Sequence, residues 1–570
     1  MTRSRMTRPA RPRPRATRFA ALLFAGALAV SLAACAKSQR GEDEGAADAG
    51  GSGGTLTFGA AGAPHLFDPF YASDGETFRV SRQIFEGLVG FAPGSSTLQP
   101  ELATRWSSSA DGRTWTFTLR PGVKFQDGTD FNADAVCANF TRWFTQTGVG
   151  QNPALSYYWI ENFGGFADHA KPSLFDSCAT AGASTAIVTL TRATGKFPSL
   201  LALPSFSMQS PAAMARYEAN NVAAQGESFS YPPYAQEHPT GTGPFVFAGY
   251  DQASGTITLR RFDGYWGAKA KLDRLIFRII PDEKARLQAL QAGDIDGYDL
   301  PNPGDWPILR GGGFNLLVRD PFDVMYVGIT QKNNPALRDL RVRQALAYAI
   351  DRATLVSAAL PEGSQVAREF YPDTVDGWAR DVQQYSYDPQ RARDLLRQAG
   401  ASNLTVNFSW PTEVSRPYLP NPQRIFGAIK EDLELAGVTV NPVSKPWNGG
   451  YLDDVDNARA DLFLLGWTGD YNSPDNFIGT FFGTLQNRFW LEAAPWGAAL
   501  VDELHAADAE PDKQTRTRMY QQINRELMGE YLPAVPISHS PSAIVVNKRV
   551  KGLVQSPLTA EKFAPVSLSG

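Results

Sequence analysis

Two short segments carry the side chains best suited to holding a small charged molecule. The first is EVSRPY at 413–418, and the second is LGWTGDYNSPD at 465–475; each follows a predicted strand. Open α/β sheets present ligand-binding groups at strand ends. Arg416 offers a planar fork of donors that fits a carboxylate, and Asp470 can accept hydrogen bonds from an ammonium group. A free peptide carries both charges, although on the residues alone a surface ion pair is the simpler interpretation.

Catalytic and metal-binding signatures do not occur in the sequence. It contains no HExxH, no GxSxG elbow, no Walker loop and no CxxC, and its five histidines form no cluster. The Gly-rich stretch 241–244 ends in Pro244, which lacks the backbone N–H that a phosphate cradle uses. We therefore expect no enzyme, no metal and no cofactor. A triad assembled from distant residues would leave no signature, so a secreted peptide hydrolase is the alternative class.

Charge and composition narrow the class of protein further. The 570 residues include 54 basic and 58 acidic side chains, which gives a formal net charge of −4. Nucleic-acid binders show a marked basic excess, so this balance argues against one. Hydrophobic residues make up 43% and charged residues 20% of the chain, values typical of globular proteins.

The N-terminus reads as an export signal. Arginines up to position 18 precede an apolar run at 19–34, which is too short for a comfortable transmembrane span. The run ends in Leu-Ala-Ala-Cys, which resembles a bacterial lipobox and predicts lipidation of Cys35. We expect a signal peptide at 1–35, a flexible Gly-rich tether at 36–54 and a folded body from Thr55.

Only two cysteines remain after Cys35. They are Cys137 and Cys178, and an even pair in an exported chain suggests one disulfide, because the compartment outside the cytoplasm is oxidising. Two free buried thiols are the alternative.

The hydrophobic pattern indicates an α/β protein. Strand-like alternation begins at 55–60, and Asp111-Gly112 marks a hairpin. After about residue 320, strands at 324–329, 404–410 and 460–467 alternate with helical patterns. That rhythm predicts a sheet covered by helices.

A series of motifs in order resembles the family 5 extracellular solute-binding proteins, the peptide/nickel/opine group. The resemblance runs from about Thr55 to the C-terminus. Its marks are PELATRW at 100–106, DGRTWTFTLRPGVKFQDG at 111–128, GTGPF at 241–245, FDGYWG at 262–267, RVRQALAYAID at 341–351 and YDPQRARDLL at 387–396.

The resemblance implies a fold of two α/β lobes. It is the type II-like periplasmic-binding-protein fold of cluster C, with an extra subdomain in the first lobe and a hinge crossed twice. The implied crossings lie near 323–329 and 538–544. Lobe I would then hold 55–322 and 538–570, and lobe II would hold 323–537.

Within the family, the chain is most similar to the dipeptide-binding members, through RPYLPN at 416–421 and GWTGD at 466–470. By that similarity Arg416 would hold a peptide carboxylate and Asp470 an ammonium group. The residues expected around them are Trp467, Thr468 and Tyr418, and from the first lobe Gly75, Glu76 and Thr77. Glu76 departs from the family pattern, which has a small polar residue there. It could read a basic side chain, a longer peptide or another cation.

The function implied by the resemblance is capture of dipeptides or short peptides for an ABC importer. Its partners would be the peptide, the membrane permease with its ATPase subunits, and the membrane itself through the lipid anchor. We expect a monomer that binds no nucleic acid, located on the outer face of the cytoplasmic membrane. A longer peptide, a metal chelate, haem or an oligosaccharide are alternative ligands.

Overall fold

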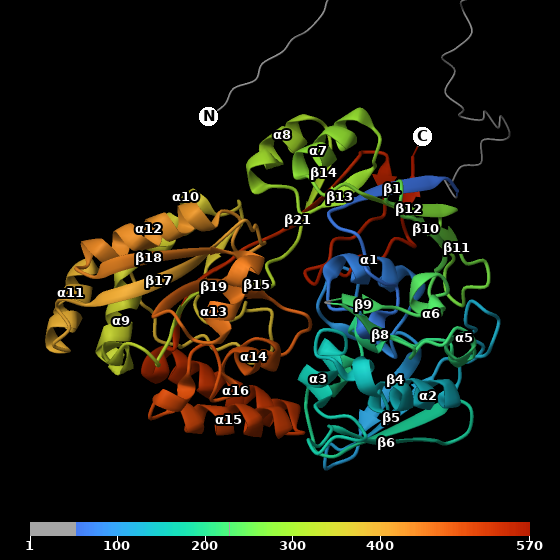
Figure 1. Ribbon diagram of the computed structural model, residues 1–570, viewed down its shortest axis with the longest axis horizontal. Helices are drawn as coiled ribbons and strands as arrows, with labels where there is room; N and C mark the ends of the chain where they lie inside the picture. Colours follow the sequence, from blue (N-terminus) through green and yellow to red (C-terminus); the bar gives the residue numbers. More distant parts are fainter. Residues whose placement is uncertain (1–52, 227, 570) are drawn as a thin grey trace, which may run out of the picture. The chain divides into compact units, whose positions relative to one another are not determined.

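The computed structural model describes residues 53–226 and 228–569 (Figure 1). The predicted signal peptide, the lipidation site Cys35 and nearly all of the predicted tether lie outside the described residues. The described chain is built on two large mixed sheets and one smaller antiparallel sheet. This architecture confirms the predicted α/β class. Within the described ranges, none of the helices is both long enough and apolar enough to cross a membrane.

The first large sheet has seven strands in the order β10-β11-β12-β1-β13-β21-β14. The strand β1 pairs in parallel with β12 and β13, and its alternating sequence TLTFGA buries Leu56 and Phe58 completely or nearly so. Helix α1 contacts this sheet through β10. The strands are β1 (Thr55–Ala60), β10 (Phe245–Asp251), β11 (Thr256–Arg261), β12 (Arg274–Ile279), β13 (Gly297–Asp299), β14 (Asn315–Val318) and β21 (Ala543–Val546). The helices inserted between them are α1 (Gly75–Ile84), α7 (Glu283–Ala292) and α8 (Trp306–Gly311).

A four-stranded antiparallel sheet forms a separate unit with its own aromatic-rich core. Gly112 sits in the left-handed region at φ 67°, which suits the predicted tight turn between β4 and β5. The side chain of Asn132 caps α2 by accepting from the N–H of Ala135. A disulfide joins Cys137 of α2 to Cys178 of β6. The elements are β4 (Ala103–Ser108), β5 (Thr114–Leu119), β6 (Phe175–Thr180), β7 (Thr185–Leu190), α2 (Ala133–Phe144), α3 (Tyr157–Phe163) and α4 (Phe197–Leu200).

The second large sheet has six strands in the order β16-β20-β15-β19-β17-β18. Helix α12 packs on β17 and β18, and α9 packs on α11 and β20 (Figure 1). The strands are β15 (Asp323–Ile329), β16 (Gln365–Val366), β17 (Thr405–Thr412), β18 (Thr439–Pro446), β19 (Leu462–Thr468) and β20 (Ala534–His539). The helices are α9 (Leu340–Ala349), α10 (Arg352–Ala359), α11 (Pro389–Gln398), α12 (Pro422–Leu435), α13 (Leu452–Asp456), α14 (Ile478–Phe482), α15 (Gly497–Ala509) and α16 (Lys513–Glu526).

The chain passes between the two large sheets twice, at 319–322 and at 540–542. The first passage therefore precedes the range 323–329 expected from the family, and β20 stays in the second sheet up to His539. The two passages are tied together, because the N–H of Ser540 donates to the carboxyl of Asp323 at 2.7 Å. Burial raises the pKa of Asp323 well above its usual value and lowers that of His539 to about 4. His539 is thus neutral at pH 7, and burial favours the protonated form of Asp323, because an isolated buried charge is costly.

A buried ion network stands beside the first passage. Asp299 accepts from Arg79 and from Arg319, each at 2.7 Å, and Arg319 also donates to Glu561 at 2.8 Å. These four side chains are at least nine-tenths buried. Each buried charge is paired with an opposite charge, which offsets the cost of removing it from water. The network therefore holds α1, β13 and the first passage in fixed positions relative to one another.

Candidate functional site

The segment after β19 places Asp470 at the end of its strand, half-buried. Its N–H donates to the side-chain oxygen of Asn476 at 2.7 Å, which fixes the loop. The hydroxyl of Tyr158, from α3, donates to the Asp470 carboxylate at 3.3 Å. Burial raises the pKa of Asp470 to about 6, and the contacts with Asn476, Tyr158 and the positive charge of Arg82 oppose that rise. The carboxylate is therefore ionised but incompletely compensated at neutral pH.

A cavity of about 300 Å³ surrounds Asp470. Helix α3 contributes Tyr157 and Glu161 to its walls, and Lys196 stands just before α4. The second sheet and its helices contribute Trp467 and His505. The walls thus come from both halves of the molecule. This cavity can receive a cationic group at the Asp470 carboxylate.

The segment after β17 presents Arg416 on a tight turn. The N–H of Arg416 donates to the carbonyl of Leu419 at 3.1 Å, and the N–H of Leu419 donates back at 2.9 Å. The guanidinium lies over the ring of Trp447, 4.7 Å from its centroid, in a cation–π contact. In the described ranges no acidic side chain lies within ion-pair distance of Arg416. It lines a second cavity, of about 220 Å³, together with Glu76.

The two segments are structurally linked. β17 and β19 are adjacent parallel strands, so their carboxyl ends meet at one edge of the sheet. The ring of Tyr418 packs directly on Gly466, where an added Cβ would lie 2.4 Å from Tyr418 Cδ2 and 2.4 Å from the carbonyl of Val324. Gly466 is therefore needed for the close approach of the two segments.

Arg416 and Asp470 nevertheless line different cavities, although the family resemblance assigns them to the two charged groups of one peptide. Helix α1 connects the two. Its first turn lines the Arg416 cavity through Glu76, and its last turn carries Arg82 close enough to influence the Asp470 carboxylate. Phe78, in the middle of α1, packs against Tyr158 with ring centroids 5.7 Å apart. Side chains of α1 and α3 thus pack together next to Asp470.

The other predicted site residues divide into two groups. Trp467 and Glu76 line cavities, Trp467 beside Asp470 and Glu76 beside Arg416. Tyr418 is only 6% exposed, and Thr77 is fully buried with its hydroxyl donating to Asp74 at 2.7 Å.

For Tyr418 and Thr77 the structure indicates a supporting role: Tyr418 packs under the loop, and Thr77 bonds to the N-cap of α1. Gly75, the first residue of α1, and Thr468, the last residue of β19, line neither cavity.

Sequence reasoning missed several residues that shape the site. Tyr158 lies in the stretch 140–185, where the family resemblance is loose, so no motif marked it. Asn476 could have been noticed, since it follows directly on the segment 465–475. No sequence motif marked Trp447. In the part of the chain that the structure describes, no group of three His, Cys, Asp or Glu side chains is arranged to hold a metal ion.

Comparison with known proteins shows what this architecture is similar to. The family model for bacterial extracellular solute-binding proteins, family 5 middle, matches residues 97–489. The dipeptide-binding protein of Escherichia coli K12 is 32% identical over 531 residues, which cover 90% of this chain and 94% of the relative. Heme-binding protein A of Haemophilus influenzae is 31% identical and covers 96% of this chain and 99% of its own length.

Solved structures agree with the sequence relatives. The crystal structure of the dipeptide-binding protein from Pseudoalteromonas sp. SM9913 in complex with Met-Leu superposes with a TM-score of 0.72 at 25% identity, covering 90% of this chain and all of that one. The family match spans more than half of the chain, and the relatives align over nearly its whole length. The chain belongs to the bacterial extracellular solute-binding proteins of family 5.

Proposed function

We propose that this protein captures dipeptides or other short peptides between its lobes and delivers them to an ABC importer. The observation that carries the proposal is the pair Arg416 and Asp470. These opposite charges stand at the carboxyl ends of two adjacent strands, and each faces a cavity whose other wall comes from lobe I. The relatives named for dipeptide binding support the same ligand class.

A short peptide satisfies both charges at once. Arg416 binds the terminal carboxylate through two parallel N–H donors, and Asp470 accepts from the terminal ammonium. Closure of the lobes expels water, so both charge-assisted bonds strengthen in the drier cleft. The ammonium replaces the hydroxyl of Tyr158 as the donor to Asp470, and Trp467 borders the first side chain. Because recognition is through termini, length matters more than side-chain identity.

The remaining parts of the proposal concern the cell. Residues 1–35 direct export, Cys35 anchors the protein to the outer face of the cytoplasmic membrane, and the stretch 36–54 tethers the body. The protein acts as a monomer; it presents the closed form to a permease and performs no catalysis. Lobe I spans 55–322 and 538–570, and lobe II spans 323–537.

The test compares peptides of different length with variants of the two charges. We expect calorimetry to show saturable binding of dipeptides and weaker binding of tetrapeptides. Arg416→Ala should weaken dipeptide binding at least ~30-fold, because removing one partner of such a pair costs ~2–5 kcal/mol. Arg105→Ala, which removes an exposed arginine on β4, is the matched control and should change nothing.

Hemin belongs in the same panel, because one relative is named for heme. Saturable hemin binding without any dipeptide binding would show that the ligand is heme and not a dipeptide. Dipeptide binding that survives Arg416→Ala unchanged would refute the assigned site. Release of free amino acids from the peptide during incubation, followed by mass spectrometry, would favour the hydrolase alternative.

A further inference from the structure

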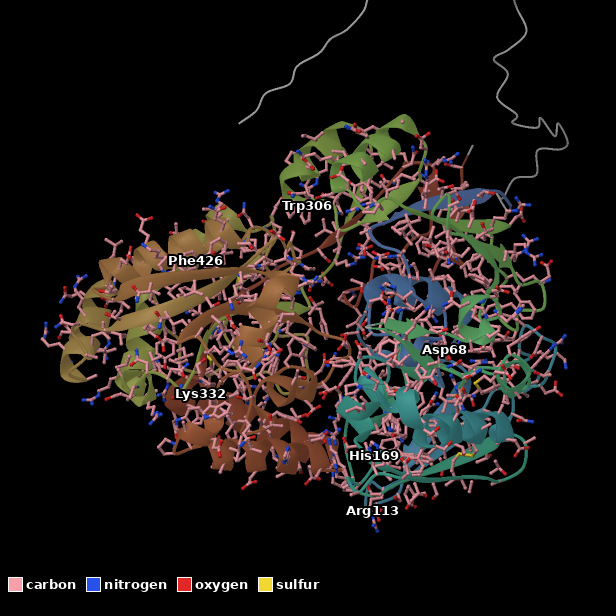
Figure 2. All side chains as sticks on the ribbon, viewed as in Figure 1. Asp68, Arg113, His169, Trp306, Lys332 and Phe426 are labelled. Carbon is pink, nitrogen blue, oxygen red and sulfur yellow. A yellow bond between two sulfur atoms is a disulfide. The ribbon has the colours of Figure 1, made fainter. Side chains whose placement is uncertain are left out.

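The cavity beside Arg416 is built by segments from both lobes. Glu76 comes from the first turn of α1 and Glu283 from the first turn of α7, and both line the cavity. Trp306 of α8, which Figure 2 labels, also lines it. The loop bearing Arg416 closes the cavity from lobe II. Its volume of about 220 Å³ leaves room for a side chain next to the group that Arg416 holds.

The arginines in this cavity differ in whether other groups of the protein already bind their guanidinium groups. Three arginines line it. Arg79 donates to Asp299 at 2.7 Å, and Arg286 donates to the two main-chain carbonyls of 280–281 at 2.7 and 2.9 Å. Arg416 alone among them makes no side-chain hydrogen bond or ion pair within the described chain. Arg416 is therefore the arginine of this cavity whose whole guanidinium can bind a ligand carboxylate, whereas Arg286 has only its fully buried Nε without a partner.

Two carboxylates in the same cavity are also available. The Glu76 carboxylate lies 3.5 Å from Nε of Arg79, but the shorter bond of Arg79 is the one to Asp299. Glu283 accepts from the N–H of Asn302 and, as far as the structure describes the chain, is in no ion pair. Both stand in the first turn of a helix, where the helix dipole favours negative charge. Each retains oxygen lone pairs for a further donor.

An apolar wall lies in the same cavity. Leu300 is 42% exposed although it is a large hydrophobic residue, and its backbone is held in the left-handed region at φ 54°. That conformation is costly for a residue with a Cβ, and strain of this kind concentrates at ligand sites. The N–H of Leu300 bonds to the carbonyl of Ala543 at 3.0 Å, which holds the strained residue in place. Leu300 and Trp306 can cover the methylene stem of a long side chain.

We propose that this cavity selects peptides whose last residue has a long cationic side chain, and that Glu76 and Glu283 are the residues that determine this preference. The inference rests on the proposed function, since Arg416 must hold the terminal carboxylate. A C-terminal lysine or arginine then offers a carboxylate to Arg416, an alkyl stem to Leu300 and a cation to the two glutamates. Of the roles that the sequence allowed for Glu76, reading of a basic side chain is the one that the cavity fits.

The test compares Ala-Lys with Ala-norleucine, which has the same four-carbon stem and no ammonium group. The unmodified protein should bind Ala-Lys at least ~10-fold more tightly, because ~1.4 kcal/mol from the charge contact corresponds to tenfold in Kd. In the double variant Glu76→Gln, Glu283→Gln the two peptides should bind within about threefold of each other. Ala-norleucine affinity reports whether that variant still folds and closes. The control Glu431→Gln, on the exposed face of α12, should keep the full preference.

Each outcome separates this inference from the proposed function. Equal binding of both peptides by the unmodified protein overturns the preference while leaving peptide capture intact. A preference that persists in the double variant shows that the two glutamates do not determine it. Failure of the unmodified protein to bind either dipeptide refutes the proposed function itself. If the double variant no longer binds Ala-norleucine, Glu76→Gln and Glu283→Gln are measured separately. If both single variants keep the full preference for Ala-Lys, the inference is overturned.

Discussion

Asp470 combines a partly buried carboxylate with a strand-end position. Its pKa of about 6, raised by burial, means that the empty protein takes up a proton there just below neutral pH. A bound ammonium group stabilises the ionised form and would lower that pKa again. Peptide binding and proton release from Asp470 are therefore linked.

This linkage predicts that affinity for dipeptides is full above about pH 6 and falls as the pH drops through 6. Because the raised pKa favours the protonated empty form, Kd should increase ~10-fold between pH 7.5 and pH 5. Calorimetry at three pH values measures it. Asp470→Asn should bind weakly and show no such pH dependence, which assigns the effect to this carboxylate. A Kd that stays constant down to pH 5 would exclude a role for this carboxylate.

At the scale of residues, the sequence pointed to candidate charged residues, but it did not show how the side chains around them pack. Arg416 and Asp470 could be selected because each follows a strand and matches a family motif. The packing of Tyr418 and Thr77 was not predictable, because no sequence pattern tells that the ring of Tyr418 lies against Gly466 or that Thr77 bonds to the N-cap of α1. Their contact with a ligand stays a prediction. Tyr158 reaches Asp470 across 312 positions of sequence, a contact that only the tertiary fold creates.

At the scale of elements, the loop after β19 also joins the lobes. Beyond Asp470, the ring of Tyr471 is buried in the core of the subdomain, and Asp475 pairs with Lys196 at 2.5 Å. Next to them, the hydroxyl of Thr194 donates to Asp508 of α15 at 2.7 Å. The loop after β19 thus carries the proposed ammonium-binding residue together with Tyr471 and Asp475, which contact the other side of the molecule.

We expect Lys196→Met to weaken closure. The substitution keeps the alkyl stem and removes the cation, so Asp475 loses its partner at the interface of the lobes. The dissociation rate of a dipeptide should rise ~10-fold or more, with a smaller change in the association rate. Lys124→Met, which breaks an exposed ion pair within lobe I, is the control. Stopped-flow measurement that finds equal dissociation rates in the Lys196→Met and unmodified proteins would contradict this role of the pair.

Elements in the second half of the chain were predictable because strands and helices alternate there with clear hydrophobic periodicity. The expected strand 404–410 corresponds to β17, and 460–467 corresponds to β19. The region 140–185 was not predictable, since α3 is short and its aromatic residues pack into a core assembled from distant segments. The hairpin at Gly112 shows the opposite case, because a tight turn involves only neighbouring residues and its Asp-Gly pair is visible in the sequence.

At the scale of the whole molecule, ligand capture depends on two passages of chain and two cavities. The two passages at 319–322 and 540–542 are linked by Asp323 and Ser540, which suits them to bend together. The cavities of Arg416 and Asp470 lie along α1, so a bound peptide would contact lobe II at both ends and α1 of lobe I between them. Family motifs predicted the two-lobed fold, whereas the separation into two cavities depends on tertiary packing that no motif shows.

The most direct measurement is calorimetry of one dipeptide in three forms, free, N-acetylated and C-amidated, against the unmodified protein, Arg416→Ala and Asp470→Asn. In the unmodified protein each block should weaken binding ~30-fold or more, since each removes one charge-assisted contact. In Arg416→Ala, amidation should cause no further loss of affinity, and in Asp470→Asn, acetylation should cause none. Acetylation should still weaken binding to Arg416→Ala, and amidation should still weaken binding to Asp470→Asn. If the unmodified protein binds the blocked dipeptides as tightly as the free one, the two charges do not hold the peptide ends.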